Sequence, residues 1–278
     1  MDKTIKLYYA RLANMGDLLN ELVVSKVFDV QVERRSFLDG ELSAIGSHLG
    51  MYTYHGGPLM RAQQLINGFR FPKVYIWGTG FIKYGEEKGH FFKRDMDFLA
   101  VRGELTRQRV EEMTGKSLDI PTADAGILAP MLMEKMPEKR YELGIIPHLC
   151  DLNDPQVQEL LESYEGSVMI NVKDEPLAVL DQIAQCKRIL SSSLHGLIVA
   201  DSLAVPNRHL VFGDRLKGDG YKFDDYYSAY GLKDPLIDLR ERKAPSLWEI
   251  EDGWAVDPKQ VEQKQQQLID CFPRELLD

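Results

Sequence analysis

The chain has 278 residues, enough for one large or two modest domains, and its 34 basic and 43 acidic residues give a formal charge of −9 at pH 7. A general nucleic-acid binder would carry clustered cations, so the acidic balance argues against that class of protein. Hydrophobic residues at 44% and charged residues at 28% are typical of a soluble globular chain and exclude a largely disordered one.

Export and cross-linking signals are absent from the sequence. Three cysteines, Cys150, Cys186 and Cys271, without C-x-x-C spacing predict neither a disulfide framework nor a structural zinc site. The chain begins without a long apolar stretch, and its longest charge-free stretch, residues 42–60, contains four glycines and a proline. We therefore expect a cytoplasmic protein, and peripheral contact with the inner face of a membrane stays open.

Short apolar runs alternate with helical patterns along the chain, which is typical of β–α units in a parallel sheet. The sequence predicts a first strand at Ile5–Ala10 and then a helix from Leu18 to Phe28. The later strand candidates are mostly apolar runs of the buried type. In chain order they are Leu42–Gly46, Val74–Gly78, Phe98–Val101, Leu143–Ile146, Val168–Ile170, Ile189–Ser191 and His209–Phe212.

The predicted helix ends and one connecting segment divide these elements into two lobes. Asp154-Pro155 and Asp257-Pro258 are capping acids followed by proline, and Gly115 is placed to end the helix before it. A connection that contains prolines and methionines ends near residue 138. We place the boundary there, between an amino-terminal lobe of residues 1–138 and a carboxy-terminal lobe of residues 139–278 whose last helix could pack back on the first lobe.

The most informative segment is Ser191-Ser192-Ser193-Leu194-His195-Gly196, between a predicted strand and an apolar helix. Serines there can cap the helix, and the unpaired N–H groups of a helix start attract anions. His195 would lie in the first turn, near an anion bound at that end. A capped core helix with one hydrogen-bonded histidine explains the same pattern.

Other polar segments also follow predicted strands, where open α/β sheets bind ligands. Asn14–Asp17 follows the first strand, although Asp17 could simply cap the next helix. Gly78 belongs to a glycine turn that lacks the third glycine of a dinucleotide motif. Arg102 could pair with a carboxylate or phosphate, or form a surface salt bridge. His148 could face a cleft or be bonded to backbone.

Together these segments resemble the polysaccharide pyruvyl transferase family, particularly its exopolysaccharide ketal-pyruvate members. The matching stretches keep their order from about Asn14 to Tyr230, and each one alone is weak. They are Asn14–Asp17, Trp77–Gly80, Val101–Arg107, Asp124–Gly126, Ile146–His148, Ser191–Gly196 and Lys222–Tyr227. The resemblance implies an α/β fold of two Rossmann-like lobes, GT-B-like, with parallel sheets flanked by helices.

The resemblance also implies a bacterial transferase of exopolysaccharide biosynthesis that moves the pyruvyl group of phosphoenolpyruvate onto two hydroxyls of a sugar. The product would be a cyclic pyruvate ketal, and phosphate would be released. The partners would be phosphoenolpyruvate and a sugar or lipid-linked oligosaccharide, with no metal or other cofactor; the oligomeric state stays open. Two alternatives remain: a GT-B glycosyltransferase that uses a nucleotide-sugar, and a non-catalytic glycan-binding relative.

The implied chemistry assigns roles to the candidate residues. His195 is the candidate acid that protonates the methylene carbon of phosphoenolpyruvate, because imidazole titrates near neutral pH. Arg102 would hold the anion from the opposite lobe, and Asp124, Asp17 and His148 are equivalent candidates for the base. The other predicted substrate-binding residues are Asn14, Gly78, Ser191, Ser192, Ser193, Arg208 and Arg215.

Ser193 departs from the family pattern. Some relatives carry an arginine at this position, two residues before the family histidine. The cationic role would therefore pass to another residue, and the nearest cations downstream are Arg208, Arg215 and Lys217.

Overall fold

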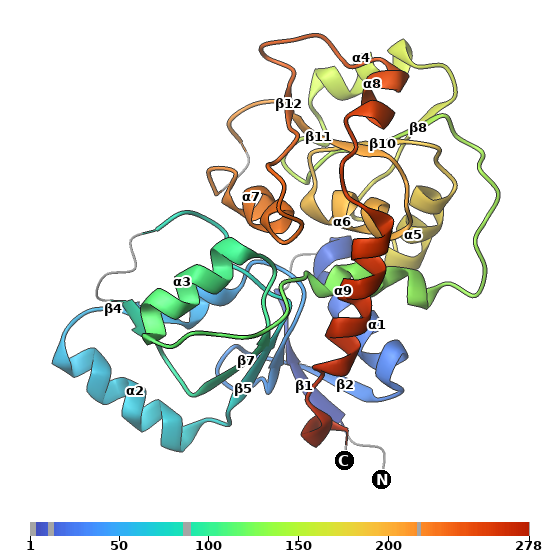
Figure 1. The fold of residues 1–278 in the computed structure, drawn as a ribbon. Coiled ribbons are helices and arrows are strands. Elements are labelled where there is room, and N and C mark those ends of the chain that lie inside the picture. Colours follow the sequence, from blue (N-terminus) through green and yellow to red (C-terminus); the bar gives the residue numbers. More distant parts are fainter. Residues whose placement is uncertain (1–3, 11–13, 86–89, 216–217, 278) are drawn as a thin grey trace.

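The computed structural model describes residues 4–10, 14–85, 90–215 and 218–277. Two five-stranded parallel sheets form two lobes, one below the other in Figure 1. The first sheet has the order β2-β1-β3-β5-β7, with β1 (Thr4–Tyr8), β2 (Gln31–Arg35), β3 (Leu42–Ser43), β5 (Val74–Trp77) and β7 (Met96–Ala100). The second has the order β12-β11-β10-β8-β9, with β8 (Leu143–Ile146), β9 (Ser167–Met169), β10 (Ile189–Ser191), β11 (Asn207–Val211) and β12 (Ile237–Asp238).

The two sheets share one topology. Counted along the chain within each lobe, both have the strand order 2-1-3-4-5, as in flavodoxin-like folds. The order reverses between β1 and β3 in the first lobe and between β8 and β10 in the second. The expected α/β class, with two Rossmann-like, GT-B-like lobes of parallel strands, is therefore confirmed, and each lobe has one of the crevices where such sheets bind ligands.

Helices cover both sheets, and β4 (Thr53–His55) pairs with β6 (His90–Phe92) in a separate two-stranded antiparallel sheet. The α-helices are α1 (Met15–Phe28), α2 (Pro58–Arg70), α3 (Glu104–Thr114), α4 (Pro155–Ser163), α5 (Pro176–Ala184), α6 (Leu194–Ser202), α7 (Tyr221–Ser228), α8 (Leu247–Asp252) and α9 (Pro258–Asp270). Short 3₁₀ helices are η1 (Leu49–Tyr52), η2 (Ala125–Leu132) and η3 (Arg274–Leu276). None of the described helices is both long and apolar enough to cross a bilayer.

Local caps explain several helix limits. Asp154 and Asp257 accept hydrogen bonds from the first turns of α4 and α9, as the sequence predicts, and Gly115 ends α3 at a φ of 68°. The alternative interpretation of Asp17 as the cap of α1 is wrong. Asn14 caps that helix, since its Oδ1 accepts the backbone N–H of Asp17 at 3.1 Å. The carboxylate of Asp17 is thus not used as a cap.

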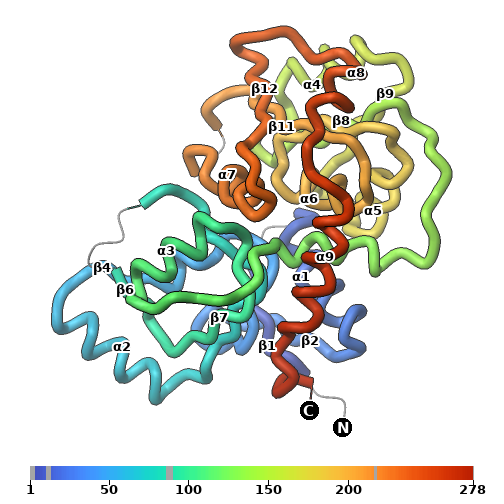
Figure 2. The backbone as a smooth tube through the Cα atoms, viewed as in Figure 1, coloured from blue at the N-terminus to red at the C-terminus, as the bar shows by residue number. Residues whose placement is uncertain are grey.

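The lobes meet around η2, which packs between α1 of the first lobe and α6 of the second. Helix α9 runs from the second lobe down to the first, as Figure 2 shows. There Trp77 Nε1 donates to the carbonyl of Leu268 at 2.8 Å, and Phe28 stacks on Phe272. The predicted boundary at residue 138 lies in the segment between β7 and β8 and stays a prediction.

Candidate active site

A cavity of about 330 Å³ lies between the lobes, at the carboxyl ends of their strands. Loops that follow β1, β3 and β5 form its wall on one side, and loops that follow β8, β9 and β10 form the other. In each sheet the crevice at which the strand order reverses therefore opens into this cavity. Open parallel sheets bind their ligands in such crevices. Its polar lining residues are Asn14, Asp17, Ser47, His48, His148, Ser193, His195 and Lys222.

His195 lies in the first turn of α6 and its ring packs against Gly16 of α1. A Cβ on Gly16 would lie 2.0 Å from His195 Nδ1, so only glycine leaves room for the imidazole. Its Nε2 is buried and has no hydrogen-bond partner among the described residues. Burial first, and then the charge of Lys222, lower the pKa of His195 to about 3, so the ring is neutral at pH 7.

His48 and Asp17 face each other across the first lobe's side of the cavity, with His48 Nε2 3.9 Å from Asp17 Oδ1. Gly46 provides the space for the histidine, because a Cβ there would lie 2.7 Å from His48 Cε1. Burial, followed by the charge of Arg102, lowers the pKa of His48 to about 4. Burial raises the pKa of Asp17 to about 6, although Asn14 donates to its carboxylate at 2.6 Å.

His148 follows β8 on the opposite side of the cavity. Its Nδ1 accepts the backbone N–H of Cys150 at 3.3 Å, which places the proton of the neutral ring on Nε2. Burial and then Lys222 lower its pKa to about 4. Ser192 Oγ accepts the backbone N–H of His148 and donates to Asp151 Oδ2 at 2.7 Å, so it fixes this loop.

Three potential metal ligands lie beside this loop. Ligand atoms of His148, Cys150 and Asp151 are within 4.8 Å of one another. Arg215 approaches Asp151 at 3.6 Å, and Lys222 lowers the pKa of His148 through its charge. Because both cations oppose a bound metal ion, we assign no metal role to the group.

Lys222, in the first turn of α7, supplies a cation that the sequence analysis did not assign to the site. It lines the cavity, and burial followed by the charge of Arg102 lowers its pKa to about 8. The chain therefore places a lysine in the same cavity as Ser193, where some relatives have arginine. Lys217, one of the cations considered from sequence, lies outside the described residues.

Arg102 does not line the cavity, which corrects the prediction that it contacts substrate. Its side chain is 0% exposed, and its Nε donates to Asp225 Oδ2 at 2.8 Å. Its Nη1 donates to Ser47 Oγ at 2.6 Å, and its Nη2 donates to the carbonyl of Phe81. Arg102 thus positions the cavity wall from behind and contributes its charge to the site.

The predicted contacts of Ser191, Ser192 and Gly78 with substrate also need correction. Ser191 Oγ donates to the carbonyl of Ile146 at 2.9 Å and accepts the N–H of Ser193, so its hydroxyl is used within the protein. Ser192 is bonded to its neighbouring loop as described above. Gly78 has a φ of +93°, and a Cβ there would lie 2.6 Å from the backbone N of Ala125, which explains the glycine as a packing requirement.

Three further residues that were predicted to contact substrate do not line the cavity: Arg208, Arg215 and Asp124. Arg208 donates to the carbonyls of Pro235 and Glu249, and Arg215 pairs with Asp154. Asp124 is fully buried; its Oδ1 accepts the N–H of Gly126, and burial raises its pKa to about 7. Its carboxylate therefore lies outside the cavity lining, and its Oδ2 has no hydrogen-bond partner among the described residues.

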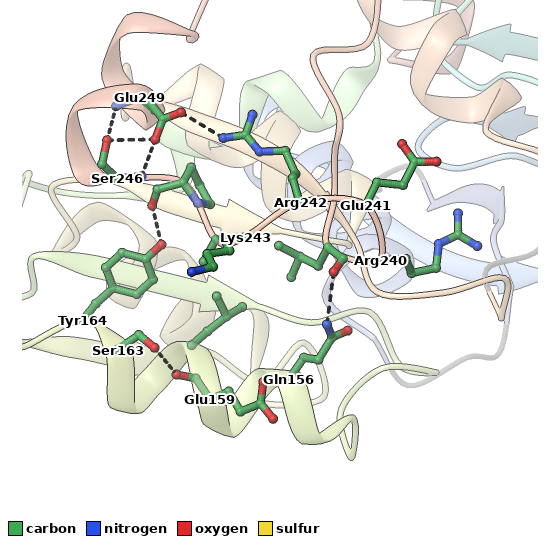
Figure 3. Close-up of a pocket in the computed structure, with 14 residues that line it drawn as sticks. Gln156, Glu159, Ser163, Tyr164, Arg240, Glu241, Arg242, Lys243, Ser246 and Glu249 are labelled. Carbon is green, nitrogen blue, oxygen red and sulfur yellow. Dashed lines mark hydrogen bonds and ion pairs between the residues drawn. The ribbon is translucent and has the colours of Figure 1, made fainter.

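A larger groove of about 880 Å³ lies on the flank of the second lobe, between α4 and residues 239–246 (Figure 3). None of the predicted site residues lines it. Arg242 pairs there with Glu249 at 2.9 Å, and Tyr164 donates its hydroxyl to the carbonyl of Pro245. Since no histidine and no predicted site residue lines this groove, the inter-lobe cavity is the better candidate for the active site.

Comparisons with known proteins identify the family of this chain. The family model of polysaccharide pyruvyl transferases matches residues 44–212, more than half of the chain. Uncharacterized protein L143 of Acanthamoeba polyphaga mimivirus is 28% identical over 232 residues, which cover 81% of this chain and 74% of that protein.

Two solved structures are similar to this chain, each at low sequence identity. A functionally uncharacterized protein from Klebsiella pneumoniae is 13% identical with a TM-score of 0.45, covering 83% of this chain and 87% of that one. An alpha1,3-fucosyltransferase is 10% identical with a TM-score of 0.30, covering 97% and 81%.

Proposed function

This chain belongs to the polysaccharide pyruvyl transferase family, and on that premise we propose that it moves the pyruvyl group of phosphoenolpyruvate onto two hydroxyls of a sugar. The product is a cyclic ketal, and phosphate is released. The observation that carries this proposal is the convergence of His48, His148, His195 and Lys222 on one cavity, each with a lowered pKa. Asp17 is the one carboxylate among the described lining residues, and an anion with a carboxylate and a phosphate would offset the charges of Lys222 and Arg102.

Lys222 and the start of α6 hold the donor in this proposal. Ser193 is the N-cap of α6 and its side chain makes no capping bond, so the first N–H groups of the helix are left for an anion. A volume of about 330 Å³ is at the low end for ligand sites. It suits a small anion next to one sugar better than a nucleotide-sugar, which disfavours the glycosyltransferase alternative.

His195 is the general acid. In the empty cavity its pKa of about 3 keeps it neutral. The charges of bound phosphoenolpyruvate offset those of Lys222 and Arg102, which raises this pKa and makes the protonated ring available only when the donor is present. The proton goes to the methylene carbon, which becomes a methyl group, and positive charge develops at the adjacent carbon.

Asp17 is the base for the sugar. It lines the cavity, and a pKa of about 6 leaves it ionised at pH 7 but still able to accept a proton. The first hydroxyl loses its proton to Asp17 as its oxygen bonds to the adjacent carbon. The bond from that carbon to the phosphate oxygen then breaks, the second hydroxyl adds, and its proton leaves on hydrogen phosphate. Solvent exchange returns Asp17 and His195 to their starting states.

The reaction is tested with purified protein, phosphoenolpyruvate and candidate glycan acceptors. We expect phosphate release that depends on acceptor, and a glycan product heavier by pyruvate less one water in mass spectrometry. Thermal shift gives a second readout, because a ligand that binds only the folded state raises the melting temperature. Stabilisation by nucleotide-sugars and not by phosphoenolpyruvate would favour the glycosyltransferase. Donor binding without turnover on any acceptor would favour the non-catalytic relative.

Lys222 makes donor binding depend on pH. Its pKa of about 8 means that the free cavity loses this positive charge as the pH rises above 8, while the phosphate of the donor is already fully ionised. We expect affinity for phosphoenolpyruvate to fall roughly fivefold to tenfold from pH 8 to pH 9, measured by calorimetry. In Lys222→Arg the charge persists and the affinity should stay flat. An unchanged pH profile in that variant would remove Lys222 from the donor site.

A further inference from the structure

Helix α2 has its apolar side turned away from the protein. It lies along the outer edge of the first lobe in Figure 1, and the exposed fractions of Leu59, Leu65, Ile66 and Phe69 are 81%, 68%, 55% and 94%. The one buried side chain of the helix is polar: Asn67 donates to the carbonyl of Lys93 at 2.9 Å and accepts from Gln63 at 3.0 Å. No α2 side chain belongs to a core cluster of the described residues. This is the reverse of an ordinary surface helix.

The sequence around α2 is basic, although the chain as a whole is acidic. No Asp or Glu occurs between Glu41 and Glu86, and this interval contains four cations, Arg61, Arg70, Lys73 and Lys83. The chain as a whole has a charge of −9. Arg61 and Arg70 are both exposed on α2 itself. Arg61 and Arg70 therefore flank the apolar face with positive charge, whereas Lys73 pairs with Asp97 at 3.5 Å.

We propose that α2 docks the protein on an anionic lipid surface, with its apolar face in the interface and its cations at the headgroups. A helix with large exposed hydrophobic residues and flanking Arg or Lys binds membranes in this way. Helix α2 lines neither the inter-lobe cavity nor the flank groove, and the charge of its two exposed arginines favours an anionic surface as its partner. A second copy of the chain is disfavoured, because two such faces would bring like charges together without acids to pair them.

Docking through α2 does not depend on the reaction at the cavity. It does have a consequence for it, since Met51 and Ile82 of the same lobe are exposed and line the cavity. Met51 precedes β4, which leads directly into α2. A docked α2 would hold this lobe, and with it one wall of the cavity, at the lipid surface.

Flotation of the purified full-length chain with vesicles tests the proposal. We expect at least tenfold more binding to vesicles of equal parts phosphatidylcholine and phosphatidylglycerol than to phosphatidylcholine alone, and release by salt. The double variant Ile66→Asp/Phe69→Asp should lose at least tenfold of this binding, with an unchanged melting temperature because both side chains are exposed. Trp248→Asp, at an exposed aromatic residue of α8, is the matched control and should bind like the parent.

Two further measurements decide between lipid and other occupants of the face. Arg61→Gln/Arg70→Gln should weaken binding to the anionic vesicles and reduce its dependence on salt. Light scattering gives the oligomeric state without vesicles. No flotation of the parent chain, flotation unaffected by Ile66→Asp/Phe69→Asp, or a dimer that this variant converts to monomer would each overturn the proposal.

Discussion

Substitution of His195 by alanine is expected to lower the turnover of phosphoenolpyruvate by roughly a thousandfold, within the range of a lost general acid. The ring lies against Gly16 with an unpartnered, buried Nε2, and no other described imidazole lies in the first turn of α6. Phosphate release under saturating donor and acceptor measures the loss. Thermal stabilisation by phosphoenolpyruvate should persist, because Lys222 remains in place.

Two comparisons separate chemistry from damage to the fold. His55→Ala removes an exposed histidine of β4 and should leave turnover unchanged. Gly16→Ala adds only a Cβ, yet that atom would lie 2.0 Å from His195 Nδ1 and must displace the ring. We expect it to reproduce most of the loss, with folding preserved because alanine favours a helix. His195→Ala protein that keeps a tenth of parental turnover would contradict the acid role.

Arg102→Met is expected to lower the free energy of unfolding by about 3–5 kcal/mol, the usual cost of leaving a buried charge without its partner. Asp225 also accepts from the backbone N and the hydroxyl of Thr106, both at 2.7 Å, so its carboxylate is fixed in the interior. Denaturation by urea, followed by fluorescence and circular dichroism, measures the change.

A surface pair serves as the matched control for Arg102. Lys73 lies 3.5 Å from Asp97, and both side chains are more than two-fifths exposed. Lys73→Met should change stability by less than about 1 kcal/mol. Adding Asp225→Asn to Arg102→Met should recover part of the loss, because it removes the charge that was left unpaired. Arg102→Met protein as stable as the parent would indicate that water reaches Asp225.

Apolar runs predicted the inner strands and the edge strands β7 and β9, whereas the other two edge strands, β2 and β12, were missed. Ile189–Ser191 and Leu143–Ile146 coincide with β10 and β8, because strands covered on both faces are apolar throughout. Strand β2 was missed because Gln31–Arg35 lies at a sheet edge, and Val32 is its one apolar residue. Helix α2 was missed for a related reason, since its apolar residues face outward and mark no core.

The site was predicted in part. Asn14, Asp17, His148, Ser193 and His195 converge on the cavity because each follows a strand end, a rule that is readable from sequence. Arg102 also follows a strand, yet whether a side chain turns toward the ligand or into the core is set by tertiary partners such as Asp225. His48 lies within the charge-free stretch and Lys222 within one of the stretches that resemble the family, and neither was assigned to the site from the sequence.

The contact between Gly16 and His195 joins residues of opposite lobes, as does the bond from Met15 N to the carbonyl of Val172 at 2.7 Å. If the lobes separate to admit substrates, the His195 ring no longer packs against Gly16, and bulk water enters the cavity at the same time. In the proposed reaction, proton delivery from His195 would then be confined to the closed arrangement of the lobes, which would protect the donor from hydrolysis while the acceptor is absent. Because Gly16 has no Cβ, the His195 ring can pack against α1, and this contact exists only while the two lobes are together.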